Sequence, residues 1–325
     1  MIMSLQDKRY YAKILLFGEY TVIRNSMALS LPFRKYSGRL SFPDQLTLLE
    51  RRLSVSSNEQ LRKFYRHLVL LQESGSRELS FDLKALRNDI DRGLYFESSI
   101  PHSYGLGSSG ALCAALYDNY GNLDDKRQSG ILTSEQMPGL KNLFSQIESY
   151  FHGTSSGLDP LISFLSHPLL IRSKGVIEKA EIPLGKIKDK LTIFLLDTRK
   201  VGKTGPLVSY FLEKMKDDEF RAKVENDLTT EVNGCIESVL TGNTDRLFTH
   251  LAKLSMMQFD LFRPMIVPGF EDAWKEGLDS GAYTLKLCGS GGGGYLLGFT
   301  RDIDRVRTHL KKYGLEPSSV MDDLL

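Results

Sequence analysis

The sequence predicts a fold of mixed helices and strands, divided into two lobes. Its 325 residues suffice for one large or two medium domains, each with its own core. Hydrophobic residues make up 41% of the chain and charged residues 25%, which are ordinary values for a globular protein. The apolar pattern changes near the charged stretch KIKDK at residues 186–190. We therefore expect an N-terminal domain over residues 1–188 and a C-terminal domain over residues 189–325.

In the N-terminal half, short apolar runs alternate with charged helical stretches. The segment KILLFGEYTVI, residues 13–23, is apolar and β-branched around Gly-Glu and predicts two strands that meet at a turn. The segment LYFESSI predicts a strand that stops before Pro101, because proline has no N–H for a strand ladder. Apolar spacing predicts helices over residues 58–73, 108–120 and 140–152, the last ending at Gly153.

The C-terminal half begins with a buried strand, LTIFLLDT at residues 191–198, and then becomes mostly helical. Helices are expected over residues 205–216, 219–241, 245–259 and 269–280. A strand TLKLCG, a glycine-rich loop, a strand YLLGF and a helix over residues 302–313 complete the chain.

Composition argues against several classes of function. Lys and Arg number 42 against 40 Asp and Glu and are spread along the chain, so no nucleic-acid footprint is indicated. No stretch approaches the roughly 20 apolar residues that cross a bilayer, so we expect no membrane association and a cytoplasmic location. Cys113, Cys235 and Cys288 lie far apart in apolar surroundings, which favours reduced core thiols.

The stretch SYGLGSSGALCAALY, residues 103–117, predicts a flexible loop that runs into a helix. Glycines let backbone N–H groups approach an anion, and a helix N-terminus favours negative charge, so the loop suits phosphate. Ser108 or Ser109 could offer a hydroxyl to phosphate or to a magnesium ion. The alternative is that Ser108 only caps the helix and the glycines form a turn. A dinucleotide fingerprint is not supported, because no strand leads directly into the loop.

A second glycine-rich loop, CGSGGGGY at residues 288–295, lies between two apolar strands. Either it is a loose hairpin, or a ligand there requires bare backbone. Two such loops in one chain are most simply explained by a nucleotide and a second substrate.

Polar residues are concentrated around Glu148, His152 and Asp159. Glu148 and His152 are four residues apart and share a helix face. Asp159 follows a loop bracketed by two glycines. A structural interpretation also stands, in which Asp159 is an N-cap, His152 closes a helix and Glu148 is solvated. Lys13 and Glu19, on either side of an apolar run, are open to both interpretations.

Four motifs, KILLFGEY, PHSYGLGSSGA, HGTSSGLDP and KLCGSGGGG, occur in this order. The order resembles the GHMP kinase superfamily, and most of all its mevalonate kinase branch, from residue 13 to about residue 299. The resemblance implies an α+β fold with an N-terminal ribosomal S5 domain 2-like domain and a C-terminal ferredoxin-like domain. It further implies an ATP- and Mg²⁺-dependent kinase that phosphorylates a small-molecule alcohol in a cleft between the lobes.

The resemblance also implies roles for individual residues. Asp159 would be the catalytic carboxylate, paired with Lys13, while Ser109 and Glu148 would ligate magnesium. The loop that would wrap the triphosphate consists of Gly105, Leu106, Gly107, Ser108, Ser109 and Gly110. Support from the C-terminal lobe would come from Gly289, Gly291 and Gly292. The residues that would face the acceptor are Glu19, Tyr20, His152 and Thr204.

The acceptor implied by the closest branch is mevalonate, phosphorylated on its 5-hydroxyl in isoprenoid biosynthesis. Tyr20 stands where mevalonate kinases usually carry His, and GEY and Gly110 are commoner in phosphomevalonate kinases. Phosphomevalonate kinase or another GHMP kinase is therefore the alternative. A non-catalytic sensor that binds ATP and a small ligand is the alternative from another class. Dimers are common among relatives, so a homodimer is compatible with the resemblance.

Overall fold

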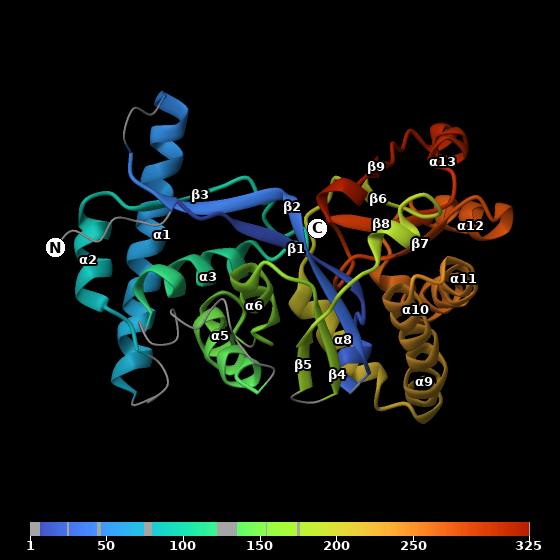
Figure 1. Ribbon diagram of the computed structural model, residues 1–325, viewed down its shortest axis with the longest axis horizontal. Helices are drawn as coiled ribbons and strands as arrows, with labels where there is room; N and C mark the ends of the chain where they lie inside the picture. Colours follow the sequence, from blue (N-terminus) through green and yellow to red (C-terminus); the bar gives the residue numbers. More distant parts are fainter. Residues whose placement is uncertain are drawn as a thin grey trace. The chain divides into compact units, whose positions relative to one another are not determined.

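A computed structural model describes residues 7–24, 26–43, 47–74, 80–121, 135–153, 155–173 and 176–324 (Figure 1). Its strands are β1 Tyr10–Phe17, β2 Ala28–Ser41, β3 Tyr95–Ser98, β4 Leu169–Ser173, β5 Val176–Lys179, β6 Thr192–Asp197, β7 Thr284–Leu287, β8 Tyr295–Thr300 and β9 Ser318–Ser319. Its α-helices are α1 Leu48–Glu73, α2 Leu83–Asp91, α3 Ser108–Tyr120, α5 Met137–His152, α6 Leu158–Leu165, α7 Leu184–Ile187, α8 Thr204–Lys214, α9 Asp218–Ala222, α10 Thr229–Thr241, α11 Thr244–Leu261, α12 Glu271–Ser280 and α13 Ile303–Leu310. Single turns of 3₁₀-helix and one π-helical stretch, Lys223–Leu228, connect some of these elements.

The chain packs into two compact units, and each unit combines several stretches of sequence. Unit 1 consists of Met1–Lys13, Arg34–Pro101 and Gly107–Ser166. Unit 2 consists of Ile14–Phe33, His102–Leu106 and His167–Leu325. The chain therefore passes from one unit to the other within the first glycine-rich loop, between Leu106 and Gly107. These units follow packing, and the domain boundary expected at residue 188 stays a prediction.

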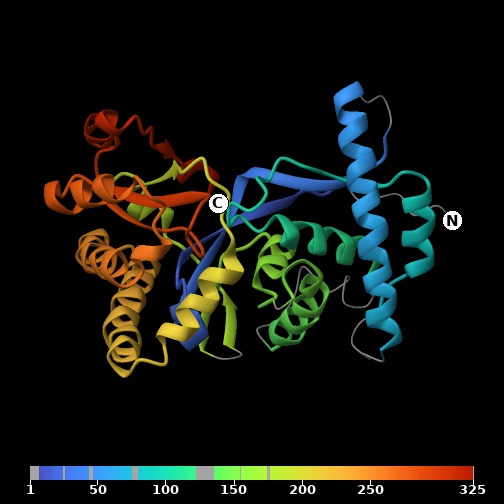
Figure 2. The same ribbon diagram turned by 180° about the vertical axis from the view of Figure 1, so that it is seen from behind.

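In unit 1, helix α1 packs beside α2, as Figure 2 shows in blue and cyan. A capping box starts α1, because the Thr47 hydroxyl accepts from the Glu50 N–H and the Glu50 carboxylate accepts from the Thr47 N–H. The Asn58 amide donates to the carbonyls of Ile90 and Leu94 at 2.9 and 2.7 Å, which ties α1 to the turn after α2. Strand β3 pairs antiparallel with the end of β2.

The core of unit 1 that supports the candidate site consists of α3, α5 and α6. Tyr117, Phe144 and Phe164 bring one aromatic ring from each helix together, with ring centroids 5.2 to 5.7 Å apart. From Gly110 to Tyr120, helix α3 is buried at all positions but one. This packing fixes the N-terminal ends of α3 and α6, where the polar motif residues lie.

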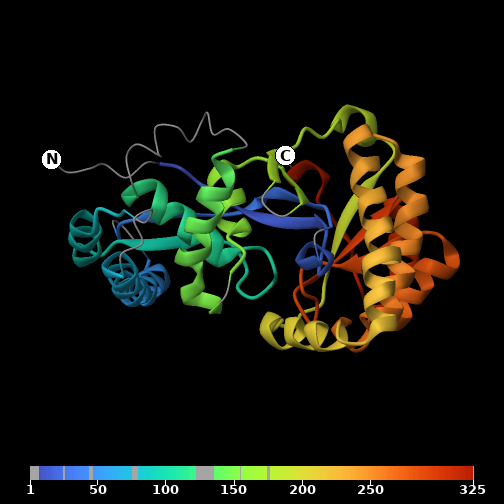
Figure 3. The same ribbon diagram turned by 90° about the horizontal axis from the view of Figure 1, so that it is seen from below.

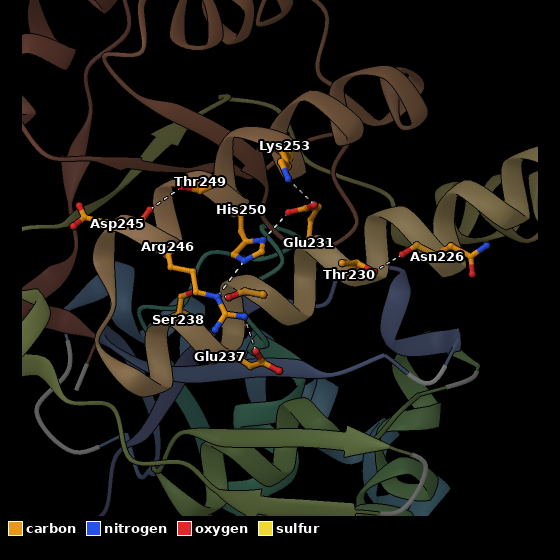
Figure 4. Close-up of polar contacts among 11 residues, drawn as sticks. Asn226, Thr230, Glu231, Glu237, Ser238, Asp245, Arg246, Thr249, His250 and Lys253 are labelled. Carbon is orange, nitrogen blue, oxygen red and sulfur yellow. Dashed lines mark hydrogen bonds and ion pairs between the residues drawn. The ribbon is translucent and has the colours of Figure 1, made fainter.

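Unit 2 contains an antiparallel sheet in the order β7-β8-β6-β9. Figure 3 shows helices α10 and α11, in orange, lying side by side. A polar network joins these two helices (Figure 4): the His250 ring contacts Glu231 at 2.7 Å, and Lys253 lies 3.5 Å from the same carboxylate. A Cβ placed on Gly234 would lie 2.4 Å from the His250 ring, so glycine makes room for that ring.

The α+β fold class and most of the expected helices are confirmed, and helix 108–120 has the expected bounds. The second strand expected within residues 13–23 is wrong. Gly18, with a φ of +114°, and Tyr20, with a φ of +63°, turn the chain into a 3₁₀-helix at Thr21–Arg24. The long strand β2 was not expected. Helix α1 begins ten residues before the expected start because of its capping box.

Candidate active site

An ion pair between Lys13 and Asp159 forms the centre of the candidate site in unit 1. The Lys13 Nζ lies 3.1 Å from the Asp159 Oδ1, and the two side chains are 9% and 32% exposed. Lys13 belongs to β1, and Asp159 lies in the first turn of α6. A Cβ placed on Gly107 would lie 3.0 Å from Lys13 Cγ and 3.4 Å from Asp159 Oδ2. The loop backbone therefore comes close to the pair at a residue that has no side chain.

Both helices that frame this pair begin at a glycine in the left-handed region. Gly107 is the N-cap of α3 with a φ of +74°, and Gly157 is the N-cap of α6 with a φ of +72°. Neither glycine can cap its helix with a side chain, although the Leu158 N–H at the start of α6 donates to the Ser156 hydroxyl at 3.3 Å. The interpretations of Ser108 and Asp159 as N-caps are therefore wrong, because a glycine holds each of those positions. The start of α3, which has no side-chain cap from its N-cap residue, favours negative charge nearby.

Glu148, on α5, is buried beside this pair. The Ser109 hydroxyl donates to Glu148 Oε1 at 2.8 Å, and the Ser155 hydroxyl donates to Oε2. Burial, followed by the nearby charge of Asp159, raises the pKa of Glu148 to about 7. The two hydroxyls and the Lys13 ammonium act in the opposite direction. Glu148 is therefore not the solvated residue of the structural interpretation.

The donor set around Glu148 suits a magnesium ion. Ser109 and Glu148 supply the hard oxygen atoms that this ion prefers. Two carboxylates, Glu148 and Asp159, act on each other, and Lys13 is the opposing cation. Within the described residues, no group of three or more His, Cys, Asp or Glu side chains could hold a metal.

Gly110 allows α3 to approach the start of α6 closely. A Cβ at this position would lie 2.7 Å from the Asp159 carbonyl carbon and 2.7 Å from the Pro160 nitrogen. The last glycine of the GLGSSG motif thus serves close helix packing, and it places α3 directly against the residue that carries the candidate carboxylate.

In unit 2, Glu19 and Tyr20 form a turn that contacts the C-terminal glycine-rich loop. Lys286, on β7, forms an ion pair with Glu19, and each side chain is 1% exposed. The Tyr20 hydroxyl donates to the Ser290 carbonyl at 2.6 Å. Lys286 was not predicted as a site residue from the sequence. Its signal was a lysine in the middle of the apolar strand TLKLCG.

The two glycine-rich segments meet within unit 2. A Cβ placed on Gly105 would lie 3.2 Å from the Cys288 carbonyl oxygen, and one on Gly294 would lie 2.7 Å from the Tyr104 carbonyl oxygen. The rings of Tyr104 and Tyr295 stack edge to face with centroids 5.1 Å apart. Backbone contacts of this kind fix the second loop, which is not the loose hairpin of the alternative interpretation.

The predicted site residues thus fall into two groups, each described within its own unit. Unit 1 brings together Lys13, Gly107, Ser109, Gly110, Glu148 and Asp159, with Ser108 as the first residue of α3. Unit 2 holds Glu19, Tyr20, Gly105, Leu106, Thr204, Gly289, Gly291 and Gly292. In this second group the Thr204 hydroxyl lies 3.1 Å from that of Ser290. His152 ends α5, and its side chain lies outside the described part of the structure.

A family model for the GHMP kinases N terminal domain matches residues 69–167, the segment that contains Ser109, Glu148 and Asp159. A comparison with curated proteins finds no match. Among solved structures, L. major mevalonate kinase in complex with R-mevalonate is 17% identical, with a TM-score of 0.61 over 98% of both chains.

Two further solved structures share the fold. Streptococcus pneumoniae phosphomevalonate kinase in complex with phosphomevalonate and AMPPNP is 13% identical, with a TM-score of 0.63 over 96% of this chain and 99% of that one. Lactococcus lactis galactokinase complexed with galactose is 14% identical, with a TM-score of 0.61 over 97% of this chain and 94% of that one. Within the described residues, none of the helices combines the length and apolar character that a membrane crossing needs.

Proposed function

Because the chain is a member of the GHMP kinase superfamily that resembles mevalonate kinase, we propose that it transfers the γ-phosphate of ATP to the 5-hydroxyl of mevalonate. The observation that carries the proposal is the ion pair of Lys13 and Asp159 at 3.1 Å. It lies beside Gly107, at the start of the helix behind the GLGSS motif. A base and a cation at this place suit phosphoryl transfer to an alcohol.

In this proposal Asp159 accepts the proton of the acceptor hydroxyl as the oxygen attacks phosphorus. The Lys13 ammonium, which is paired with the Asp159 carboxylate, stabilises negative charge on the attacking oxygen. Phosphoryl transfer passes through a loose transition state rich in charge, so positioning and electrostatics provide the catalysis. No covalent enzyme intermediate is required.

The triphosphate of ATP would lie along residues 105–110. The uncapped N-terminus of α3 and the bare backbone at Gly107 would receive its negative charge. Ser109 and Glu148 would hold the magnesium ion, which neutralises phosphate oxygens when it is bound. Gly289, Gly291 and Gly292 would support the nucleotide through the contact of their loop with residues 104–105.

The resemblance assigns Glu19, Tyr20, His152 and Thr204 to the acceptor. The Glu19 carboxylate is paired with Lys286 and the Tyr20 hydroxyl donates to the Ser290 carbonyl, so in this proposal these two residues act on the acceptor by shaping the turn. Tyr20 and Gly110 favour a second candidate, phosphomevalonate kinase, because both residues are commoner in that branch. The second candidate differs in its acceptor, which carries an additional phosphate. Phosphorylation of an alcohol and phosphorylation of a phosphate group are separated by offering each acceptor alone.

The test is a coupled assay of ADP release, with mevalonate, phosphomevalonate, galactose and homoserine offered one at a time. Turnover with mevalonate alone supports the proposal, and turnover with phosphomevalonate alone supports the second candidate. Binding of AMPPNP without a phosphorylated product from any acceptor would favour the non-catalytic sensor and contradict the proposed kinase.

A further inference from the structure

Two buried contacts in unit 2 join the turn after β1 to the start of the C-terminal glycine-rich loop. The first is the ion pair of Glu19 and Lys286, and the second is the hydrogen bond from the Tyr20 hydroxyl to the Ser290 carbonyl. Lys286 lies two residues before Cys288, where the loop begins, and Ser290 lies inside the loop. Neighbouring residues of the turn therefore hold the loop at its entrance and in its interior.

Burying this ion pair in the core carries a large desolvation free energy. Each of its side chains is 1% exposed, and moving a charged group out of water costs several kcal/mol. Burial raises the pKa of Glu19, and the Lys286 ammonium acts against that rise. Lys286 also donates to its neighbour's carbonyl, Leu287 O, at 2.6 Å, so the ammonium is fixed from two sides. Apolar residues of similar volume often stabilise a core as well or better, so stability alone does not explain the pair.

Five of the seven residues 288–294 are glycines, so only Cys288 and Ser290 contribute side chains that could fix the shape of the loop. Gly289, Gly291, Gly292 and Gly294 all have φ values between +71° and +75°. The loop in turn packs by backbone against Tyr104 and Gly105, the start of the loop proposed to hold the triphosphate. Contacts that fix residues 288–294 therefore also fix Tyr104 and Gly105, at the start of the first glycine-rich loop.

We propose that Glu19 and Lys286 are positioning residues that, with the Tyr20 hydroxyl, hold residues 288–294 in the shape that supports nucleotide binding. The inference rests on the proposed function and assigns Lys286 a role in the same site. The pair acts through the loop: it orients the turn, the turn presents Tyr20 to Ser290, and the loop supports Tyr104 and Gly105. A loop shaped before the nucleotide arrives avoids the entropy cost of ordering it on binding.

The first experiment compares Tyr20→Phe with Tyr283→Phe. Each variant removes a tyrosine hydroxyl that donates to a backbone carbonyl at 2.6 Å within unit 2, but the partner of Tyr283 is Ala273, outside the loop. We expect Tyr20→Phe to speed amide hydrogen exchange of residues 288–294 in the ligand-free protein by about threefold or more. We expect Tyr283→Phe to leave exchange in this loop unchanged.

The second experiment replaces the ion pair as a unit, with Glu19→Leu and Lys286→Met together, so that no unpaired charge stays buried. The control is Glu231→Gln, which removes a carboxylate from the α10–α11 network of Figure 4. We expect the double variant, and not the control, to speed exchange of residues 288–294 and to raise the Kd for AMPPNP by about tenfold.

Unchanged loop exchange and unchanged Kd in a folded double variant would overturn the inference. Should the double variant not fold, equal loop exchange in Tyr20→Phe and Tyr283→Phe would overturn it instead. Loop exchange is measured without substrate, so it stays informative if the wild-type protein phosphorylates none of the acceptors. Failure of the proposed function and failure of this inference are thereby distinguished.

Discussion

Gly110 of α3 lies directly against the backbone of Asp159, so that a Cβ at Gly110 would be 2.7 Å from the Asp159 carbonyl carbon. Backbone atoms at the start of α6 cannot move away without moving Asp159 and its ion pair with Lys13. The close packing of α3 against α6 therefore also sets the position of Asp159, the candidate base.

Gly110→Ala is expected to lower the free energy of unfolding by about 1–3 kcal/mol, because the added methyl overpacks the contact between α3 and α6. Because the displaced atoms belong to Asp159 and Pro160, turnover should fall as well. The control is Gly139→Ala in helix α5, where a Cβ meets nothing within 4 Å. That variant should gain about 1 kcal/mol from helix propensity. Urea denaturation of both proteins checks the difference in sign.

Asp159→Asn is expected to reduce kcat by at least about 10²-fold, because the amide cannot accept the hydroxyl proton. Lys13→Met should reduce kcat by about 10²–10³-fold, because the cation beside the reacting oxygen is lost. The loss should fall on kcat more than on the KM for ATP. Steady-state kinetics of ADP release measures both constants. An Asp159→Asn enzyme with near wild-type turnover would exclude this carboxylate as the base.

Glu148→Gln is expected to raise the magnesium concentration needed for half-maximal turnover by at least about tenfold. The physical reason is the loss of a carboxylate oxygen that lies beside Ser109. Ser109→Ala should have the same effect in a milder form, since one neutral oxygen is lost. Magnesium titrations at saturating ATP check the order of the two effects. Identical titration curves for wild type and Glu148→Gln would contradict the assignment of Glu148 as a ligand.

Gly157→Ala is expected to lower the free energy of unfolding by about 2–4 kcal/mol, because left-handed strain and a steric clash add. A Cβ at this N-cap would lie 2.0 Å from the Lys141 carbonyl oxygen. Gly281→Ala is a matched control, because Gly281 is also left-handed, with a φ of +61° and a ψ of 14°, but a Cβ there meets nothing within 4 Å. The control should show only the strain, about 1–2 kcal/mol. Thermal or urea unfolding of the two variants separates clash from strain.

Local sequence signals predicted which segments form helices and strands better than they predicted which strands pair with each other. Helix α3 could be bounded from the sequence, because a glycine-serine loop precedes its apolar run and Gly121 follows it. Strand β2 was missed because it pairs with β3 and β4, which come much later in the chain. Its pairing is decided by long-range contacts, which periodicity within a short window does not report.

In the candidate site, too, contacts between residues distant in the sequence could not be predicted from local patterns. The spacing of residues could not bring Lys13 to Asp159, and only the motif resemblance linked them before the structure placed them 3.1 Å apart. Glu19 lies in the motif KILLFGEY and Lys286 begins the motif KLCGSGGGG, but nothing in either motif indicated that the two side chains form an ion pair. The mevalonate acceptor, the cytoplasmic location, the homodimer and the boundary at residue 188 stay predictions.

Helix α3 starts at Gly107, which has no capping side chain, so the stability of this helix depends on what is bound at its start. A serine or aspartate cap typically contributes about 1 kcal/mol to a helix start, and a glycine cannot supply that contribution through a side chain. An oxyanion bound there would supply it from outside. Melting temperature in a panel of inorganic anions would therefore report occupancy of this helix end before any acceptor is known.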